Sequence, residues 1–233
     1  MKTAAICLGL LIGAALPSIA SGQVTLSFDD LALPDYGQVP ATYGDGLDPN
    51  VPDVQYRTLH PTSGATISPY VEFWQDGYGD LGKVVYADAS GYVAEIRLVP
   101  AEGYGVRLVS FDLAGYPYQD KTATVLRVVD GNGDVVLDLI AAGQSHVEGN
   151  GFDAGGETVP AHSTFLLNLT VAGPLALQWG VDWDIGLDNL TFEAVPLSAI
   201  PEAAHSGLVV ALAMFGVAAW QGRRRGLGRP VRP

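Results

Sequence analysis

The sequence predicts an all-β fold, an antiparallel β-sandwich of jelly-roll type, placed between two terminal hydrophobic segments. Apolar residues recur with a period of two from Gln23 to Pro196, as expected for strands that bury one face. The 233 residues include 29 Gly and 15 Pro, a composition that favours many turns over long helices. Between the terminal segments no window keeps apolar residues at helical spacing over three turns, so long helices are not expected there.

Nine windows carry the strand pattern. In the clearest, residues 163–171, alternate positions from Phe165 to Val171 place apolar side chains on one face. The nine windows are residues 24–28, 82–87, 92–99, 106–113, 122–129, 134–142, 163–171, 175–181 and 189–195. Short strands joined by Gly, Pro and Asp turns are typical of a sandwich. Because no linker or internal repeat interrupts them, residues 23–196 are predicted to form one domain.

Two stretches between these windows differ from the rest. Residues 29–64 contain five prolines and little alternation, which predicts a long ordered loop with one or two short strands, serving as a binding surface or covering a sheet edge. Asp130–Asp134 reads Asp-Gly-Asn-Gly-Asp, a spacing similar to the start of an EF-hand loop. The twelfth position is Ala141 instead of the glutamate that calcium binding requires. The pair Asn132-Gly133 stands between two alternating runs, which predicts a tight hairpin turn.

The N-terminus, residues 1–22, has the features of a secretory signal peptide. Lys2 precedes an apolar core from Ala4 to Leu16, and Pro17 is followed by small residues at which a signal peptidase can cleave. This order predicts export. The single cysteine, Cys7, lies inside the signal, so the mature protein is expected to contain no disulfide.

The charge is unevenly distributed along the chain. The full sequence has a net charge of −13, whereas residues 23–198 alone contain 24 acidic and 6 basic residues, a net of −18. A body this acidic repels phosphate backbones, which argues against nucleic acid as a partner.

Catalytic motifs are absent from the sequence. It contains no G-x-S-x-G elbow, P-loop or dinucleotide fingerprint, and these are the patterns of several enzyme classes. The four histidines are scattered, and the glutamates form no tight acidic motif. The protein is therefore expected not to be an enzyme.

The C-terminal segment, residues 197–233, ends in an apolar run followed by arginines. Residues 207–220 carry no charge, and Arg223, Arg224 and Arg225 follow almost at once. Extended back to Ala203, the run has the length of a helix that crosses a thin bilayer. The arginines then place the C-terminus in the cytoplasm and the acidic body outside.

The order of motif, apolar helix and basic cluster resembles the tail of PEP-CTERM sorting proteins of Gram-negative bacteria. The motif is Ile200-Pro201-Glu202-Ala203, in which Ala203 replaces the final proline of the family's Pro-Glu-Pro. The body is similar to ectodomains attached to such tails, in stretches such as residues 109–117 and 185–196. The resemblance implies recognition at Pro201 and Glu202 by an exosortase-type membrane transpeptidase. The protein would pass through an inner-membrane intermediate to the cell surface or the medium.

Proteins of this family are generally linked to exopolysaccharide and biofilm formation. The leading hypothesis is therefore a β-sandwich that binds or organises extracellular polysaccharide, with Trp74 and Tyr78 as candidate sugar-stacking rings among nearby aromatic residues. The alternative for these rings is an ordinary place in the core or on the surface. Two other functions stay open: an extracellular polysaccharide hydrolase with two converging carboxylates, and a structural matrix protein without a small ligand.

A structural calcium ion is the one cofactor expected. Asp29 and Asp30 end the first predicted strand, and Asp188 and Asn189 lie in the last. In a jelly roll these strands commonly run side by side, which would bring the four side chains to one edge. Calcium takes six to eight oxygen ligands, and resemblance to sugar-binding jelly rolls, many of which hold a structural calcium between such strands, supports the expectation. The alternative is that the aspartates only form turns.

Overall fold

The computed structural model describes residues 22–46, 51–152, 155–181 and 183–200. The predicted signal peptide, except for Gly22, the predicted transmembrane helix and the predicted sorting residues Pro201 and Glu202 lie outside these ranges. In the described part of the chain no helix has the length and apolarity that a membrane span requires. The one helical element there is a three-residue 3-10 turn, η1 (Leu197–Ala199).

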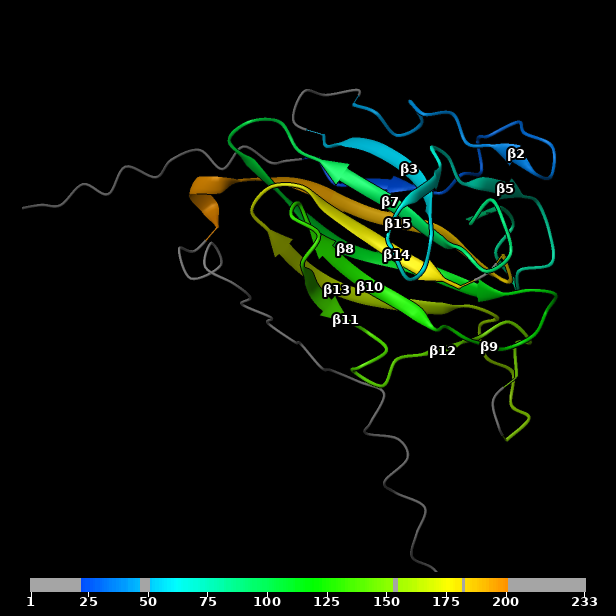
Figure 1. Ribbon diagram of the computed structural model, residues 1–233. Helices are drawn as coiled ribbons and strands as arrows, with labels where there is room; N and C mark the ends of the chain where they lie inside the picture. The colour runs from blue at the N-terminus through cyan, green and yellow to red at the C-terminus, as the bar shows by residue number, and fades with distance from the viewer. Residues whose placement is uncertain (1–21, 47–50, 153–154, 182, 201–233) are drawn as a thin grey trace, which may run out of the picture.

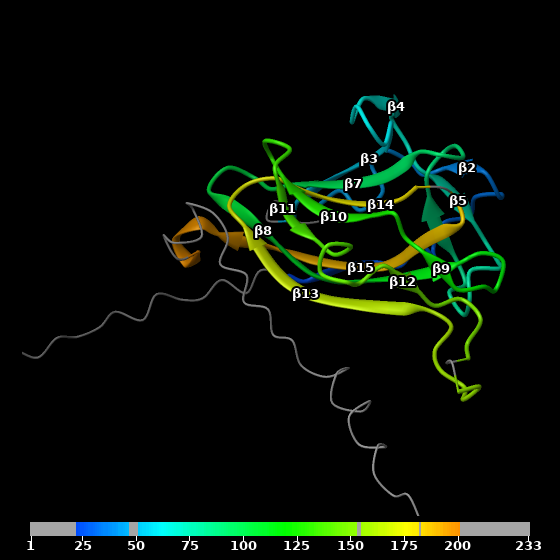
Figure 2. The same cartoon turned by 60° about the horizontal axis from the view of Figure 1, so that its bottom comes forward.

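The described chain forms two antiparallel sheets that pack face to face, which confirms the predicted all-β sandwich (Figures 1 and 2). The seven-stranded sheet has the order β13 (Ser163–Val171), β8 (Tyr104–Gly115), β15 (Ile185–Pro196), β6 (Val84–Tyr86), β5 (Glu72–Trp74) and β2 (Gly37–Gln38), with β1 (Val24–Leu26) also paired to β15. The six-stranded sheet has the order β11 (Val135–Asp138), β10 (Val125–Asp130), β14 (Leu175–Gly180), β7 (Val93–Val99), β3 (Asp53–Leu59) and β4 (Thr66–Ser68). A third, two-stranded sheet pairs β9 (Lys121–Thr122) with β12 (His146–Val147).

The core consists of the inward-facing side chains of both large sheets, which fill the space between them. On β7, Ala94, Ile96 and Leu98 are buried as the alternation predicts. Phe111 of β8 stacks on Phe165 of the edge strand β13 with ring centroids 5.0 Å apart, which stabilises the pairing of these two strands. Apolar burial on this scale is the main source of stability for a sandwich without disulfides.

All nine predicted windows contain strands, but the windows missed several short ones. The segment 29–64 holds two strands, β2 and the seven-residue β3, which agrees in number with the one or two short strands expected there, although β3 is longer than expected. Window 122–129 is divided, because Ala123 and Thr124 separate β9 from β10 and the two strands enter different sheets. Period-two patterns shorter than four residues are not detectable in sequence, which explains the missed strands β2, β4, β5 and β12.

The stretch Asp130–Asp134 forms the predicted hairpin turn between β10 and β11. The backbone N–H of Gly133 donates to the carbonyl of Asp130 at 3.1 Å, and Gly133 has φ of 89°. The Asp130 carboxylate accepts the N–H groups of Asn132 and Asp134. Asp130 thus stabilises its own turn, as aspartate commonly does.

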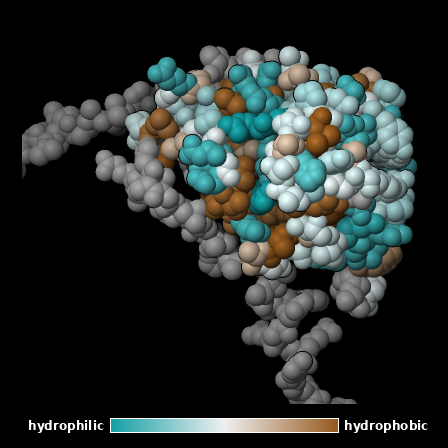
Figure 3. Space-filling view, viewed as in Figure 1, coloured by the Kyte–Doolittle hydropathy of each residue, from teal (hydrophilic) through white to brown (hydrophobic). Residues whose placement is uncertain are grey.

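The surface is mixed in polarity. On the face seen in Figure 3, apolar residues form separate patches between hydrophilic ones. Among the described residues, the most exposed large apolar side chain is Leu166 on the edge strand β13, at 74%, followed by Tyr36 at 65%.

Candidate functional sites

An aromatic cluster covers the outer face of the seven-stranded sheet near its β2 edge. Phe73 of β5 and Val85 of β6 face the main core, so their neighbours Trp74 and Tyr86 point to the opposite face. There they join a second hydrophobic cluster, separate from the main core. We call the following six residues the aromatic cluster: Tyr36, Trp74, Tyr78, Tyr86, Tyr116 and Trp183.

The rings of the aromatic cluster form a continuous series of edge and stacked contacts. Tyr36 meets Trp74 edge-on at 4.8 Å between centroids, and Trp74 meets Tyr116 at 5.8 Å. Tyr116 in turn contacts Tyr78 at 5.1 Å and Trp183 at 5.1 Å. These distances and angles are those of favourable aromatic pairs, so the rings hold one another in place.

Only part of the aromatic cluster reaches solvent. Tyr78, one of the two predicted stacking residues, is 1% exposed, and its hydroxyl donates to the backbone carbonyl of Trp183. The other, Trp74, is half-buried. The exposed members are Tyr36 at the start of β2 and Trp183 before β15, 65% and 41% exposed. Sequence reasoning missed these two because they lie far from Trp74 along the chain.

Gly77 makes room for this packing. A Cβ atom at this position would lie 2.6 Å from the ring of Tyr116, and its φ of 90° is a conformation that favours glycine. Beside it the Asp76 carboxylate accepts hydrogen bonds from the Tyr118 hydroxyl at 2.6 Å and the Gly77 N–H at 2.7 Å. These two donors lower the pKa of Asp76, which keeps an ionised group beside the exposed rings.

Further carboxyl groups border the aromatic cluster. Glu72 accepts a hydrogen bond from the Tyr86 hydroxyl at 3.1 Å. Burial, together with a hydrogen bond and charge repulsion from Asp88, raises the pKa of Glu72 to about 7, against the lowering effect of Tyr86. Asp35 accepts the backbone N–H of Gln75 at 3.1 Å. The surroundings of the rings are therefore rich in hydrogen-bond acceptors and acidic.

The residues predicted to bind calcium lie where the first and last strands meet. β1 pairs with β15 in the register Leu26↔Leu190, which places Asp29 near Asp188. Asp188 is 4% exposed, and its carboxylate accepts the N–H of Asn189 at 2.7 Å. Asp30 instead accepts the Tyr43 hydroxyl at 2.7 Å. The strand pairing behind the expectation is thus present, and Asp30 is committed to a different partner.

Asp112 is the member of this group that sequence reasoning missed. It lies on β8 directly opposite Asp188 in the strand register, and its carboxylate accepts the side-chain N–H of Asn189 at 2.8 Å and the Thr164 hydroxyl at 2.6 Å. Burial above all, and then the charges of Asp29 and Asp112, raise the pKa of Asp188 to about 7 against the lowering effect of the Asn189 N–H. The pairing of β8 with β15 that creates this juxtaposition joins positions 76 residues apart, which a single sequence does not reveal.

Among the described residues, one set of three metal-ligating side chains brings a ligand atom from each within 4.8 Å of the others: Asp120, His146 and Glu148. The predicted calcium residues do not meet that measure. In the sequence the set was hidden, because His146 appeared only as one of four scattered histidines.

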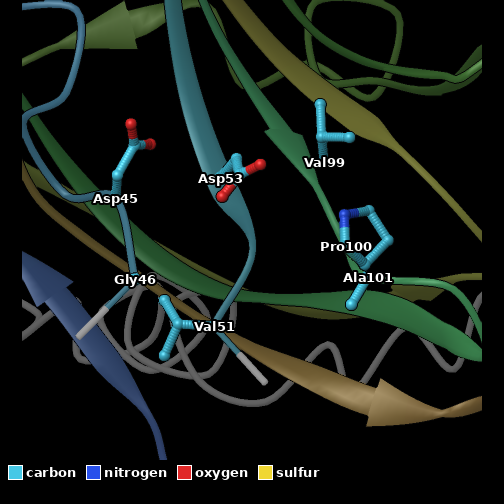
Figure 4. Close-up of a pocket in the computed structure, with 7 residues that line it drawn as sticks. All are labelled: Asp45, Gly46, Val51, Asp53, Val99, Pro100 and Ala101. Atoms are coloured by element: carbon cyan, nitrogen blue, oxygen red, sulfur yellow. The ribbon is translucent and has the colours of Figure 1, made fainter. Parts of the chain in front are cut away.

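A hollow of about 240 Å³ lies where β3 begins and the neighbouring strand β7 ends, in the six-stranded sheet (Figure 4). Asp45, Asp53 and Val99 are among the residues that line it. The carboxylate of Asp45 accepts the backbone N–H of Val54 at 2.8 Å, so it holds the chain at the start of β3. Asp45 and Asp53 are the only charged side chains among the residues that line the hollow, and we assign no ligand to it.

Comparisons with known proteins give little further guidance. No family model matches the chain, and no curated protein matches it. Among solved structures, the fold is similar to part of an isomalto-dextranase from Arthrobacter globiformis T6 complexed with panose, with a TM-score of 0.30 and 10% identity. The match covers 75% of this chain and 32% of that one, so this chain spans about a third of the length of the enzyme.

Proposed function

We propose that this chain is an exported jelly-roll β-sandwich that binds extracellular polysaccharide through the aromatic cluster. The observation that carries the proposal is the series of mutually packed rings that ends in exposed Tyr36 and Trp183. The C–H faces of sugar rings pack on such aromatic surfaces, and the partly polar Tyr and Trp rings suit a site that is apolar and wet at once. Because Trp74 and Tyr116 support the two exposed rings, these are pre-organised for binding.

The bordering groups favour an uncharged polysaccharide. Ionised Asp76 and the acceptors Glu72 and Asp35 present oxygens to sugar hydroxyls. The same carboxylates repel uronic acids, and the net charge of −18 across residues 23–198 adds to the repulsion. A neutral glycan therefore fits the site better than an acidic one.

The pair of carboxyl groups Glu72 and Asp88 does not have the spacing of a glycosidase pair. A raised pKa such as that of Glu72 is a property of general acids. However, Glu72 shares a hydrogen bond with Asp88, whereas a glycosidase pair stands at least about 5 Å apart to hold the scissile bond between its carboxyl groups. The pair therefore leaves no room for that bond.

The test is a glycan array of neutral glucans and their uronic-acid counterparts, probed with the full chain. Wild type is expected to bind neutral glycans and to discriminate against the acidic ones. Tyr36→Ala and Trp183→Ala should each weaken binding about fivefold, since an aromatic contact contributes on the order of 1 kcal/mol.

Tyr36→Phe keeps the ring and should retain most of the binding. Leu166→Ala, which removes an exposed apolar side chain on the distant edge strand β13, is the matched control and should have no effect. The proposal fails if no glycan binds, or if the Tyr36 and Trp183 variants bind as wild type does.

We propose that the tail sorts the protein. Pro201 and Glu202 would be recognised by an exosortase-type transpeptidase while the predicted helix and Arg223–Arg225 hold the chain in the inner membrane. Glu202→Ala is expected to slow processing in the native host, because this carboxylate is the one charged group of the motif. Ala203→Pro, which completes the family's motif, should not slow it. An unchanged size and location of the product in Glu202→Ala would contradict this role.

We also propose that calcium binds between Asp29, in the turn that follows β1, and Asp188 of the neighbouring strand β15, with Asp112 close by. Three carboxylates without a cation repel one another, and a divalent ion removes that repulsion. Backbone carbonyls and water would complete the six to eight oxygens that calcium requires.

A further inference from the structure

We propose that Asp120, His146 and Glu148 form a binding site for a divalent transition metal such as Zn²⁺, independent of the aromatic cluster. The site belongs to the small sheet of β9 and β12. These strands pair in the register His146↔Thr122 and Val147↔Lys121. Continued by one residue, the same register places Glu148 opposite Asp120.

The strand geometry brings all three side chains to one face. His146 and Glu148 are two residues apart, so they project to the same side of the strand, and the cross-strand neighbour of Glu148 projects there as well. His146 Nε2 lies 3.0 Å from Glu148 Oε1. One ligand atom from each of the three residues lies within 4.8 Å of the other two, so a small adjustment of these side chains would bring all three to the roughly 2.0–2.2 Å from one ion that Zn²⁺ requires.

A shell of hydrogen bonds already fixes the acidic ligands. Asp120 Oδ1 accepts the backbone N–H groups of Gly149 at 3.0 Å and Asn150 at 3.2 Å, and Oδ2 accepts the Asn150 side-chain N–H at 3.0 Å. The backbone N–H of Glu148 donates to the Ser163 hydroxyl at 2.9 Å. Partners of this kind orient metal ligands and are part of a metal site.

One carboxylate oxygen at the proposed metal site has no hydrogen-bond partner. Glu148 Oε2 is buried and has no hydrogen-bond partner, although buried polar atoms in proteins nearly always have one. The nearby cation Lys121 is engaged elsewhere, since its Nζ lies 3.3 Å from Asp184. A bound metal ion would supply the positive partner that this carboxylate lacks.

The ligand types select the class of metal. An imidazole nitrogen with two carboxylate oxygens suits Zn²⁺ and its transition-metal neighbours, whereas calcium prefers oxygen ligands alone. This site is therefore expected to discriminate against calcium, in contrast to the all-oxygen group around Asp188.

The experiment is a calorimetric titration of the full, metal-free chain with Zn²⁺ at pH 7.5, followed by thermal melting with and without Zn²⁺. Wild type is expected to bind one ion at this site and to melt at a higher temperature when loaded, because a ligand that binds only the folded state stabilises it. His146→Ala should weaken the affinity by more than the roughly 10-fold to 100-fold contributed by outer hydrogen-bond partners. Asn150→Ala, which removes such a partner, should weaken it by about 10-fold.

His162→Ala is the matched control. His162 also contacts a carboxylate, with Nδ1 2.6 Å from Asp80 Oδ1, but it belongs to no group of three metal-ligating side chains among the described residues. Zn²⁺ affinity should be unchanged in this variant. The inference is overturned if Zn²⁺ does not bind, if His146→Ala binds it as wild type does, or if calcium competes equally for the site.

Discussion

Replacing Asp188 by Asn is expected to stabilise the calcium-free protein at pH 8, to do so less at pH 5, and to leave its stability nearly unchanged below about pH 4. The pKa of Asp188 is raised from an ordinary 3.8 to about 7, so the folded protein at pH 8 contains a buried ionised carboxylate between two others. Asn has the same shape and can accept the same hydrogen bond from the Asn189 N–H. The gain at pH 8 is about 4 kcal/mol, from the size of the pKa difference.

The direction of the pH dependence follows from proton binding. Between pH 4 and pH 7 the folded state holds a proton on Asp188 that the unfolded state has released, so wild-type stability falls as pH rises through this window. Glu72, whose pKa is also raised to about 7, contributes a fall of the same sign. Urea unfolding across pH 5–8 should therefore show a shallower slope in Asp188→Asn and a residual slope that Glu72→Gln reduces further.

Calcium is expected to offset the destabilisation that ionised Asp188 causes at pH 8, and to do so in wild type but not in Asp188→Asn. A cation between Asp29 and Asp188 stabilises the ionised carboxylates, so the melting temperature of wild type at pH 8 should rise with calcium and fall with a chelator. Asp188→Asn should lose the response, while Asp130→Ala, in the hairpin turn of β10 and β11, should keep it. If wild type shows no response and Asp188→Asn is no more stable than wild type at pH 8, both the calcium site and the buried charge are refuted.

Local patterns in the sequence were sufficient for the long strands. Residues 92–99 and 106–113 alternate for several positions, and the strands β7 and β8 lie there. For residues 29–64 the same reasoning predicted one or two short strands but did not place β3, because prolines on either side obscured its alternation. It also joined β9 to β10, since a window of continuous alternation does not reveal that the chain changes sheets at Ala123 and Thr124.

The sites depended on strand pairing, which local patterns do not specify. The expected neighbourhood of the first and last strands is present, but Asp112 enters the carboxylate group only through the register of β8 with β15. In the same way Tyr36 and Trp183 reach Trp74 through the sheet order and two loops. His146 and Glu148 lie two residues apart in the sequence, but only the pairing of β12 with β9 brings Asp120 close to them.

The second large effect is expected at Glu95, in a polar row that crosses four strands of the six-stranded sheet. Arg57, Glu95, Gln178 and Arg127 are successive register partners on β3, β7, β14 and β10. Glu95 is 3% exposed, forms an ion pair with Arg57, and accepts the side-chain N–H of Gln178 at 2.6 Å. The Arg127 Nε in turn donates to Gln178 Oε1 at 2.7 Å.

Glu95→Ala should destabilise the protein by about 3 kcal/mol, because removing one member of a buried ion pair leaves the other charge uncompensated. Arg57 is the group left behind, and its Nε is already buried without a partner. Glu95→Gln keeps a hydrogen bond to Gln178 and should cost less. Glu102→Ala, in the exposed loop after β7, is the control and should change stability by no more than about 0.5 kcal/mol. Urea unfolding measures all three.

The row also explains why the outer face of this sheet is buried where the sequence predicts exposure. Val93 and Ala176 lie on the same face as Glu95 and are buried, and the arginine stems offer the apolar cover that such residues need. Arg57→Ala should therefore destabilise through lost cover as well as lost charge, and its effect should combine with Glu95→Ala to less than the sum of the two. Strict additivity of the two variants would contradict this, because it would show that the ion pair contributes nothing to stability.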